Sequence, residues 1–201
     1  MKRQIYLDYA YGVADLIWQD YDALRGQAIE RGKAALRDQG KLQNTFQFVG
    51  TVAPAEVMRY RQTGVVRYLE RAKRYLLDVY DVYHALKTYQ EVENIPIRNA
   101  DFPTLGWMFE PEPYISAYNQ IKDIAGFTDE EIARVETVVE RAMRPIELMP
   151  EYGPMNRSML RALNLAAAGS SFPEHREAAK WLKMGRHIFA DSLYGLNSIG
   201  I

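Results

Sequence analysis

The segment VVRYLERAKRYLLDVYDVYHAL, residues 65–86, decides the fold class of this chain. Its apolar residues recur three or four positions apart: Val65, Leu69, Ala72, Leu76, Val79, Tyr83 and Leu86. This spacing places them on one side of an α-helix, where they can be buried together. The stripe stops after about three heptads, so it indicates a helix of a globular domain rather than a coiled coil.

A weaker helical pattern precedes this segment. Residues 5–36 carry one apolar face, formed by Leu7, Tyr11, Ala14, Trp18, Tyr21 and Leu24. Gly12, Gly26 and Gly32 weaken the pattern, so either one helix or two helices with a break fit it. Residues 39–54 are predicted as a loop with extended character at 46–49.

The second half of the chain contains four further predicted helical stretches. Prolines interrupt residues 91–113, so we expect a loop there. A helix over 114–125 should end at Gly126, and Thr128 with Glu131 forms a capping box for the next helix. Pro145 is expected to bend or end that helix. The last two helices are predicted over 155–169 and from Ser171 and Pro173 onward, with an apolar stripe of Ala178, Trp181, Leu182, Ile188, Phe189 and Ser192.

The pattern as a whole predicts an all-α protein of six or seven helices in antiparallel hairpins. A bundle, a superhelix and an arc of an α/α ring all fit this pattern. Residues 1–201 are expected to form a single helical domain, with 1–53 as a less certain N-terminal extension. The basic residues Arg59, Arg61, Arg67, Arg71, Lys73 and Arg74 are interpreted as a solvated helix face.

Composition excludes several classes of protein. Hydrophobic residues make up 48% of the chain, and 25 basic residues nearly balance 26 acidic ones. We therefore expect a folded core, but no nucleic-acid or membrane partner. The absence of cysteine excludes disulfides, the three histidines have no ligand spacing, and no phosphate-binding loop occurs, so no metal or cofactor is predicted. No signal peptide or membrane-spanning segment is visible, and the compartment is not predicted.

One turn carries candidate ligand-binding groups. Residues 151–157, EYGPMNR, place the amide of Asn156 and the guanidinium of Arg157 at the first turn of a helix. Backbone N–H groups without helical partners lie beside them, and such donors suit a carboxylate ligand. The alternative interpretation is an ordinary N-cap at Asn156. An N-cap needs no arginine, however, and a cation opposes the helix dipole at this end.

Aromatic residues supply candidate sugar-binding surfaces. Trp107, Tyr114 and Tyr152 offer flat faces that can stack on sugar rings, and Glu110 could accept hydrogen bonds from hydroxyls. The alternative for Trp107 is a hydrophobic plug under the proline-rich loop. For Glu110 the alternative is simple solvation of that loop.

With these residues, the region 60–195 resembles the helical domain of heparinase II/III-like polysaccharide lyases, a superfamily that includes alginate lyases. The resembling features are the helix over 65–86, the Gly106-Trp107 loop before the helix over 114–125, the helix capped by Thr128, and the Tyr152–Arg157 turn followed by an Ala/Leu helix and Phe172-Pro173. The resemblance implies an incomplete (α/α) toroid, commonly in a periplasmic or secreted protein. It also implies that a β-sandwich follows, and that the tyrosine base lies beyond residue 201. The chain is therefore expected to be an N-terminal part of a lyase.

The resemblance implies a role for each candidate residue in β-elimination on an acidic polysaccharide. Asn156 would neutralise the uronate carboxylate, and Arg157 would assist it. Arg157 stands where the family has histidine or tryptophan. From their residue types, Tyr152, Trp107, Tyr114 and Glu110 are the candidates for substrate binding.

Two other functions remain open from the residues alone. An (α/α)-barrel glycoside hydrolase needs paired carboxylates, for which Asp101 and Glu110 are candidates. A noncatalytic helical scaffold would bind a peptide instead. An arc of hairpins would also expose an apolar edge, so we expect association through underpacked C-terminal residues, namely Trp181, Ile188, Phe189 and Leu193.

Overall fold

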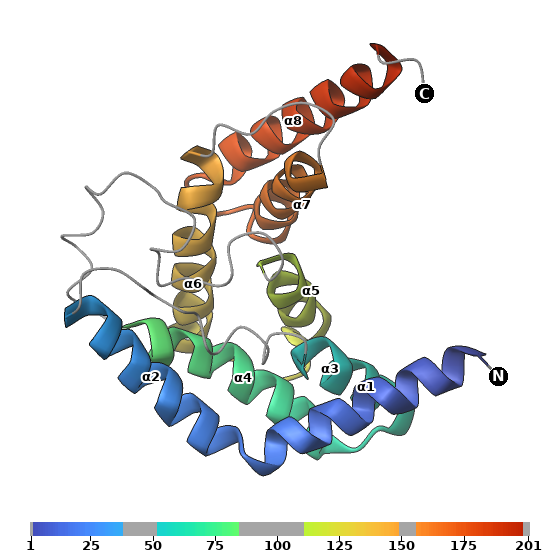
Figure 1. The fold of residues 1–201 in the computed structure, drawn as a ribbon, viewed down its shortest axis with the longest axis vertical. Coiled ribbons are helices and arrows are strands. Elements are labelled where there is room, and N and C mark those ends of the chain that lie inside the picture. Colours follow the sequence, from blue (N-terminus) through green and yellow to red (C-terminus); the bar gives the residue numbers. More distant parts are fainter. Residues whose placement is uncertain (1, 38–51, 85–110, 149–155, 199–201) are drawn as a thin grey trace.

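The computed structural model describes residues 2–37, 52–84, 111–148 and 156–198 (Figure 1). These residues form eight α-helices and no strand, which confirms the all-α class within the described part of the chain. The helices are α1 (Lys2–Gln19), α2 (Tyr21–Arg37), α3 (Val52–Thr63), α4 (Val66–His84), α5 (Pro111–Ile121), α6 (Asp129–Leu148), α7 (Asn156–Ser171) and α8 (Ala178–Ser198). Among them, none is both long and apolar enough to cross a lipid bilayer.

The N-terminal pattern forms two helices, and the break falls at Asp20. The Asp20 carbonyl accepts the N–H of Leu24 at 2.9 Å, so Asp20 already serves the first turn of α2. Gly12 and Gly26 lie inside α1 and α2 with no atom near the position of a missing Cβ. Glycine therefore lowers the helix propensity of these segments without deciding where the chain turns.

Helix α3 was missed by the sequence prediction, which extended the preceding loop to Pro54. The helix begins at Val52, and Pro54 lies in its first turn, where a backbone N–H has no helical partner. Nearly every residue from Val52 to Val57 is buried, so no one-sided stripe marks the segment. Its end is conventional, because Gly64 adopts a φ of 69° directly after Thr63.

Proline also shifts the predicted bounds of α5 and α6. Pro111 opens α5 three residues before the expected start, at a helix position that suits proline. The helix ends at Ile121, and Gly126 closes the following turn with a φ of 60°. Helix α6 begins at Asp129 and continues through Pro145 to Leu148. The prediction that Pro145 could end this helix is therefore wrong.

The capping box of α6 is confirmed by its two reciprocal hydrogen bonds. The N–H of Thr128 donates to Glu131 Oε2 at 2.8 Å, and the N–H of Glu131 donates to Thr128 Oγ1 at 3.2 Å. Lys73 also pairs with Glu131, at 2.8 Å, and this contact joins α4 to the start of α6.

The stripe of α4 supplies the centre of the core. Leu69, Ala72, Leu76 and Val79 are buried, together with an apolar face of α6 that includes Val135, Val139 and Met143. Val65 lies just before α4 and is exposed. The side chains of Tyr83 and Leu86 are outside the described part of the structure. The expected helix is therefore present, with a buried face that begins at Leu69.

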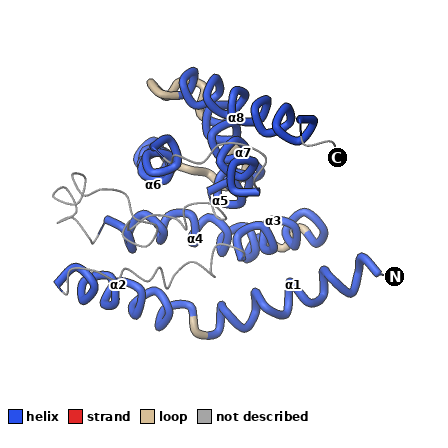
Figure 2. The backbone as a smooth tube through the Cα atoms, turned by 45° about the horizontal axis from the view of Figure 1, so that its top comes forward, coloured by secondary structure: helices blue, strands red, loops and turns tan. Residues whose placement is uncertain are grey.

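The helix contacts follow two series. Helix α1 packs on α3, α3 on α5 and α5 on α7, while α2 packs on α4 and α4 on α6. The pairs α3 with α4, α4 with α5, α5 with α6 and α6 with α7 connect the two series, and α8 packs on α7. Figure 2 shows α1 and α2 as an outer layer alongside α3 and α4, and α7 and α8 lie at the far end.

Two glycines let helices α7 and α8 approach each other closely. A Cβ on Gly169 would lie 2.6 Å from the Ala178 carbonyl oxygen, and one on Gly185 would lie 2.8 Å from that of Ala162. The C-terminal end of α7 thus meets the start of α8, and the two helices run antiparallel. Neither glycine can carry a side chain without moving backbone.

Candidate functional site

Helix α7 positions the predicted carboxylate-binding residues. Asn156 is its first residue and is exposed to solvent, and Arg157 follows with a half-buried side chain. The prediction that this turn opens a helix is confirmed. Residues 151–155, with the candidate Tyr152, lie outside the described residues.

A buried arginine holds the first half of α7 against α6. Arg161 is fully buried, and its Nε donates to the Ile146 carbonyl at 2.6 Å. Its Nη2 donates to the Glu147 carbonyl at 2.7 Å. These carbonyls belong to the last turn of α6, where a helix has no N–H groups of its own to satisfy them. The charge also suits the negative end of the α6 dipole.

A buried asparagine ties α7 to a second helix end. Asn164 lies one turn after Arg161, and its Oδ1 accepts the N–H of Glu112 at 3.0 Å. Glu112 is in the first turn of α5, so Asn164 acts as an N-cap supplied by another helix. Helix α7 therefore binds the C-terminal end of α6 and the N-terminal end of α5 through adjacent turns.

Ser158 adds an unsatisfied polar group next to Asn156 and Arg157. Its side chain is fully buried, and Oγ has no hydrogen-bond partner among the described residues. A buried hydroxyl in this state lowers stability by about 1–3 kcal/mol. The first turn of α7 therefore holds an exposed amide, a partly buried cation and an unused hydroxyl at three successive positions.

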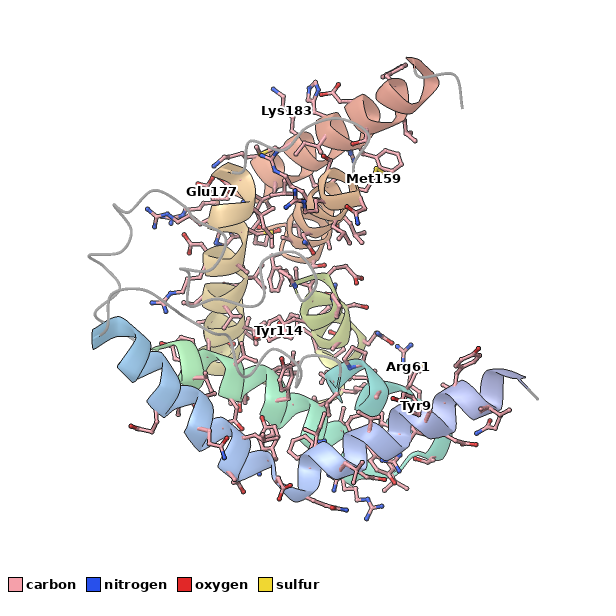
Figure 3. All side chains as sticks on the ribbon, viewed as in Figure 1. Tyr9, Arg61, Tyr114, Met159, Glu177 and Lys183 are labelled. Carbon is pink, nitrogen blue, oxygen red and sulfur yellow. The ribbon has the colours of Figure 1, made fainter. Side chains whose placement is uncertain are left out.

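Tyr114 lies in the core between the helices (Figure 3). Its hydroxyl donates to the Leu76 carbonyl at 2.8 Å, and burial raises the pKa of this phenol well above its usual value. The ring has no exposed face for a sugar to stack on. Trp107, Glu110 and Asp101 lie outside the described residues.

A second polar cluster joins α1 to α3 and α4. Arg59 donates from Nη1 and Nη2 to the two carboxylate oxygens of Asp15, at 2.8 and 2.7 Å, and Arg71 Nη1 reaches Asp15 at 3.2 Å. The interpretation of these arginines as a solvated face is therefore wrong for both. A pattern of charges along one helix does not reveal partners on another helix.

Glu56 is the least expected member of this cluster. It is fully buried, and its Oε1 lies 3.4 Å from Arg71 Nη1, while Oε2 has no partner among the described residues. Burial raises the pKa of this carboxyl above its usual value, and the Arg71 and Arg59 charges oppose that shift. The cluster therefore joins α1, α3 and α4 through charged side chains.

His175 packs between two helices. Its ring stacks on Trp181 with the centroids 4.7 Å apart, and Nε2 lies 3.7 Å from Glu140 Oε2. It therefore bridges α6 and α8. Within the described residues, no group of three or more acidic or histidine side chains is placed to hold a metal ion.

A scan against protein-family models, a search of curated proteins and a search of solved structures each found no match to this chain. The functional assignment therefore depends on the first turn of α7 and on the packing of the helices around it.

Proposed function

We propose that this chain is the helical domain of a polysaccharide lyase that cleaves uronic-acid glycans, such as alginate or heparan-type polymers, by β-elimination. The observation that carries the proposal is the position of Asn156, exposed as the first residue of α7. Its amide and the N–H groups of the first turn are donors of the kind that a uronate carboxylate accepts.

The chemistry requires such donors. The proton at C5 of a uronate is weakly acidic, because removing it adds negative charge next to a carboxylate. Donors held in place at that carboxylate stabilise the enolate-like state, and electrostatic stabilisation of this kind is commonly a large part of catalysis. Asn156 supplies a neutral donor, and Arg157 supplies a positive charge.

The anchoring of α7 supports this role. Arg161 and Asn164 bind the ends of α6 and α5, so the first turn of α7 belongs to a helix fixed at two points. A site built on a rigid element loses little free energy to ordering when the ligand binds. Ser158, with its unused hydroxyl, offers one more polar group in the same turn.

The arrangement of the helices supports the proposed architecture. Alternate helices pack on each other in two series, α1, α3, α5 and α7 in one and α2, α4 and α6 in the other. An arc of an (α/α) toroid built from antiparallel hairpins has two such concentric series. We therefore assign the chain to part of an incomplete toroid.

Tyr114 is not assigned a part in the chemistry. A catalytic phenol needs a lowered pKa and a hydroxyl within reach of the substrate. Burial raises the pKa of Tyr114, and its hydroxyl is bonded to the Leu76 carbonyl.

The same packing of helices also fits a noncatalytic scaffold that binds a peptide. The two functions differ in their dependence on Asn156. A scaffold would use a broad surface of several helices, and a lyase would lose uronate binding when one amide is removed.

Binding of acidic oligosaccharides tests the proposal. Asn156→Ala should weaken binding of oligouronates by about tenfold or more, because a hydrogen bond to a charged group contributes about 1.5–3 kcal/mol. Titration calorimetry measures the affinity, with a neutral glucan as the ligand control. Thr128→Ala is the matched protein control, since it removes a helix cap of α6 at a distance from α7.

Two results would contradict the proposal. Equal affinity of Asn156→Ala and the native chain would leave Asn156 as a helix cap alone. Equal affinity for acidic and neutral glycans would show that the site does not recognise the carboxylate. For the complete protein, formation of an unsaturated uronate product, followed by its ultraviolet absorbance, tests the reaction itself.

A further inference from the structure

A buried carboxyl group lies where α1, α3 and α4 meet. Glu56, on α3, is fully buried, and its Oε1 is 3.4 Å from Arg71 Nη1 on α4. Its other oxygen, Oε2, has no hydrogen-bond partner among the described residues. The same Nη1 also donates to Asp15 Oδ1, on α1, at 3.2 Å. One guanidinium nitrogen therefore serves two carboxyl groups on two different helices.

The hydrogen-bond donors are divided unevenly between these two carboxyl groups. Asp15 is partly exposed and accepts two further bonds from Arg59, at 2.8 and 2.7 Å. Among the described residues, Glu56 receives the contact at 3.4 Å, which is longer than the roughly 2.7–3.2 Å usual for such a bond. A buried carboxylate needs several donors to keep its charge, whereas a neutral carboxylic acid needs fewer. The contacts therefore suit Asp15 as the ionised group and Glu56 as the neutral one.

Helix α1 holds both arginines in this arrangement. It places the ring of Trp18 beneath Arg71, with the ring centroid 5.3 Å from the guanidinium carbon. A second aromatic ring of α1 lies 5.0 Å from Arg59 in the same way. If α1 moved away, Asp15 would leave with it, and both guanidinium groups would be free to bind the Glu56 carboxylate. Departure of α1 therefore favours the ionised form of Glu56, and its return favours the neutral form.

We propose that the attachment of α1 is a proton-dependent latch, in which Glu56 is neutral while Arg59 and Arg71 hold Asp15. Ionisation of Glu56 makes this residue compete with Asp15 for the two arginines. It also leaves a buried charge with few donors, and the release of α1 relieves that state. A rise in pH therefore loosens α1, and a fall in pH fastens it.

The direction follows from the linkage between proton binding and the docking of α1. With α1 in place, burial raises the pKa of Glu56 above its ordinary 4.5, although the Arg71 and Arg59 charges oppose this shift. Above pH 4.5 docking weakens by about tenfold per pH unit at most, until the pKa of the docked state is reached. Asp15 acts in the other direction and in stronger acid, because the hydrogen bond from Arg59 holds its pKa below the ordinary 3.8.

The other charged and titratable groups around the cluster keep their charge between about pH 5 and pH 8. They are Asp15 and Tyr11 on α1, Arg59 on α3, and Arg71 and Tyr68 on α4. Helix α5 also packs on α3, and the hydroxyl of its Tyr114 is bonded to the Leu76 carbonyl. Salt-bridged carboxyl groups titrate below this range, and phenols and guanidinium groups titrate above it. Among the described groups of the cluster, Glu56 is therefore the source of any pH dependence in this range.

Hydrogen exchange followed by mass spectrometry of peptic fragments tests the latch, with each rate corrected for the intrinsic dependence of exchange on pH. We expect α1 to exchange faster than α7, and its protection to fall by about fivefold or more between pH 5 and pH 8. Glu56→Gln, which stays neutral, should keep the protection of α1 constant to within about twofold over this range. Glu130→Gln, at an exposed position on α6, is the matched control and should show the same fall as the native chain.

Asp15→Asn separates the latch from a buried charge that only lowers stability. Without the competing carboxylate, both arginines can serve Glu56 while α1 is in place. Helix α1 of this variant should therefore exchange faster at pH 5, and the fall in its protection should shrink to about twofold or less.

Four results would overturn the proposal. They are protection of α1 in the native chain that does not depend on pH, an equal fall in Glu56→Gln, and exchange of α1 only together with α7. The fourth is an Asp15→Asn chain that keeps the full pH dependence, because competition for the arginines would then have no part in the attachment of α1.

Discussion

Single buried polar residues set the positions of the helix ends in this protein. Arg161 and Asn164 supply the hydrogen bonds that the last turn of α6 and the first turn of α5 lack. Both side chains lie on α7, a helix rich in alanine and leucine, and both are buried. A buried arginine that donates to the carbonyl groups at a helix end is held there by hydrogen bonds and by the helix dipole.

Arg161→Met should destabilise the fold by about 2–4 kcal/mol, because two buried carbonyls would lose their donors. Urea denaturation measures the change in the free energy of unfolding. Arg141→Met, at an exposed position on α6, is the control and should change that free energy by about 0.5 kcal/mol at most. Equal stability of the two variants would show that water satisfies the carbonyls when Arg161 is removed.

Glu56→Gln should make the protein more stable at neutral pH. Burial raises the pKa of Glu56 above its ordinary 4.5, so the folded state binds this proton more tightly than the unfolded state does. The ionised carboxylate therefore opposes folding above the folded pKa, and this opposition disappears as the pH falls below 4.5. Thermal melts across this pH range should show the gain from Glu56→Gln shrinking on acidification.

Asp15→Asn should make the protein less stable at neutral pH, the opposite of the change expected for Glu56→Gln. The hydrogen bond from Arg59 holds the pKa of Asp15 below its ordinary 3.8, so the carboxylate stabilises the fold above that pH. Its contribution is lost as the pH falls through the folded pKa. We expect a loss of about 0.5–1 kcal/mol at neutral pH, as for a partly exposed ion pair. The same sign for Asp15→Asn and Glu56→Gln would contradict the assignment of the cluster.

At the scale of elements, the most extensive contact among the described helices is the pairing of α7 with α8. Gly169 and Gly185 let the two backbones approach, and Trp181 fixes the start of α8 by donating from its indole N–H to Glu147 and by stacking on His175. Trp181 is therefore buried rather than underpacked. The pairing of α7 with α8 also helps to position the candidate site, because Asn156 lies in the first turn of α7.

Gly185→Ala should destabilise the protein by about 1–3 kcal/mol, because the added methyl group would lie 2.8 Å from the Ala162 carbonyl oxygen. Helix propensity alone predicts the reverse, a gain of about 1 kcal/mol. Gly26→Ala, in open space on α2, should show that gain. Calorimetric melting of the two variants separates packing from propensity, and changes of the same sign would contradict the close approach.

At the scale of the whole molecule, many charged contacts attach α1 and α2 to α3 and α4. They include ion pairs and arginines stacked on aromatic rings, with Arg59 over Tyr11 at 5.0 Å and Arg71 over Trp18 at 5.3 Å. The far end of the molecule is held by close apolar packing of α7 and α8. Partly exposed charges are screened by salt, and buried apolar contacts are not weakened by it.

Salt should therefore loosen one end of the molecule only. We expect hydrogen exchange in α1 and α2 to become several-fold faster at high concentrations of sodium chloride, with α7 and α8 unchanged. Mass spectrometry of peptic fragments measures both ends in one experiment. Faster exchange at both ends, or at neither, would show that the arginine contacts do not attach α1 and α2.

The exposed apolar surface at the C-terminal end follows the expectation in part. Phe189 and Leu193 are 47% and 42% exposed, as expected for an open edge, whereas Ile188 and Trp181 are buried. The sequence stripe of α8 contained Trp181, Ile188 and Phe189. A stripe shows that residues share a face, but the width of the buried part depends on the neighbouring helix.

The sequence by itself determined the all-α class, the buried stripe of α4, the capping box of α6, the helix start at Asn156 and the turn at Gly126. These features depend on residues a few positions apart, so local periodicity and hydrogen bonding specify them. Only the tertiary structure decided that Tyr114 is a core residue, that Arg161 and Asn164 hold the ends of other helices, and that Arg59 and Arg71 pair with Asp15 on α1. Partners more than ten residues apart are brought together by packing, and no local pattern encodes which side chains will meet.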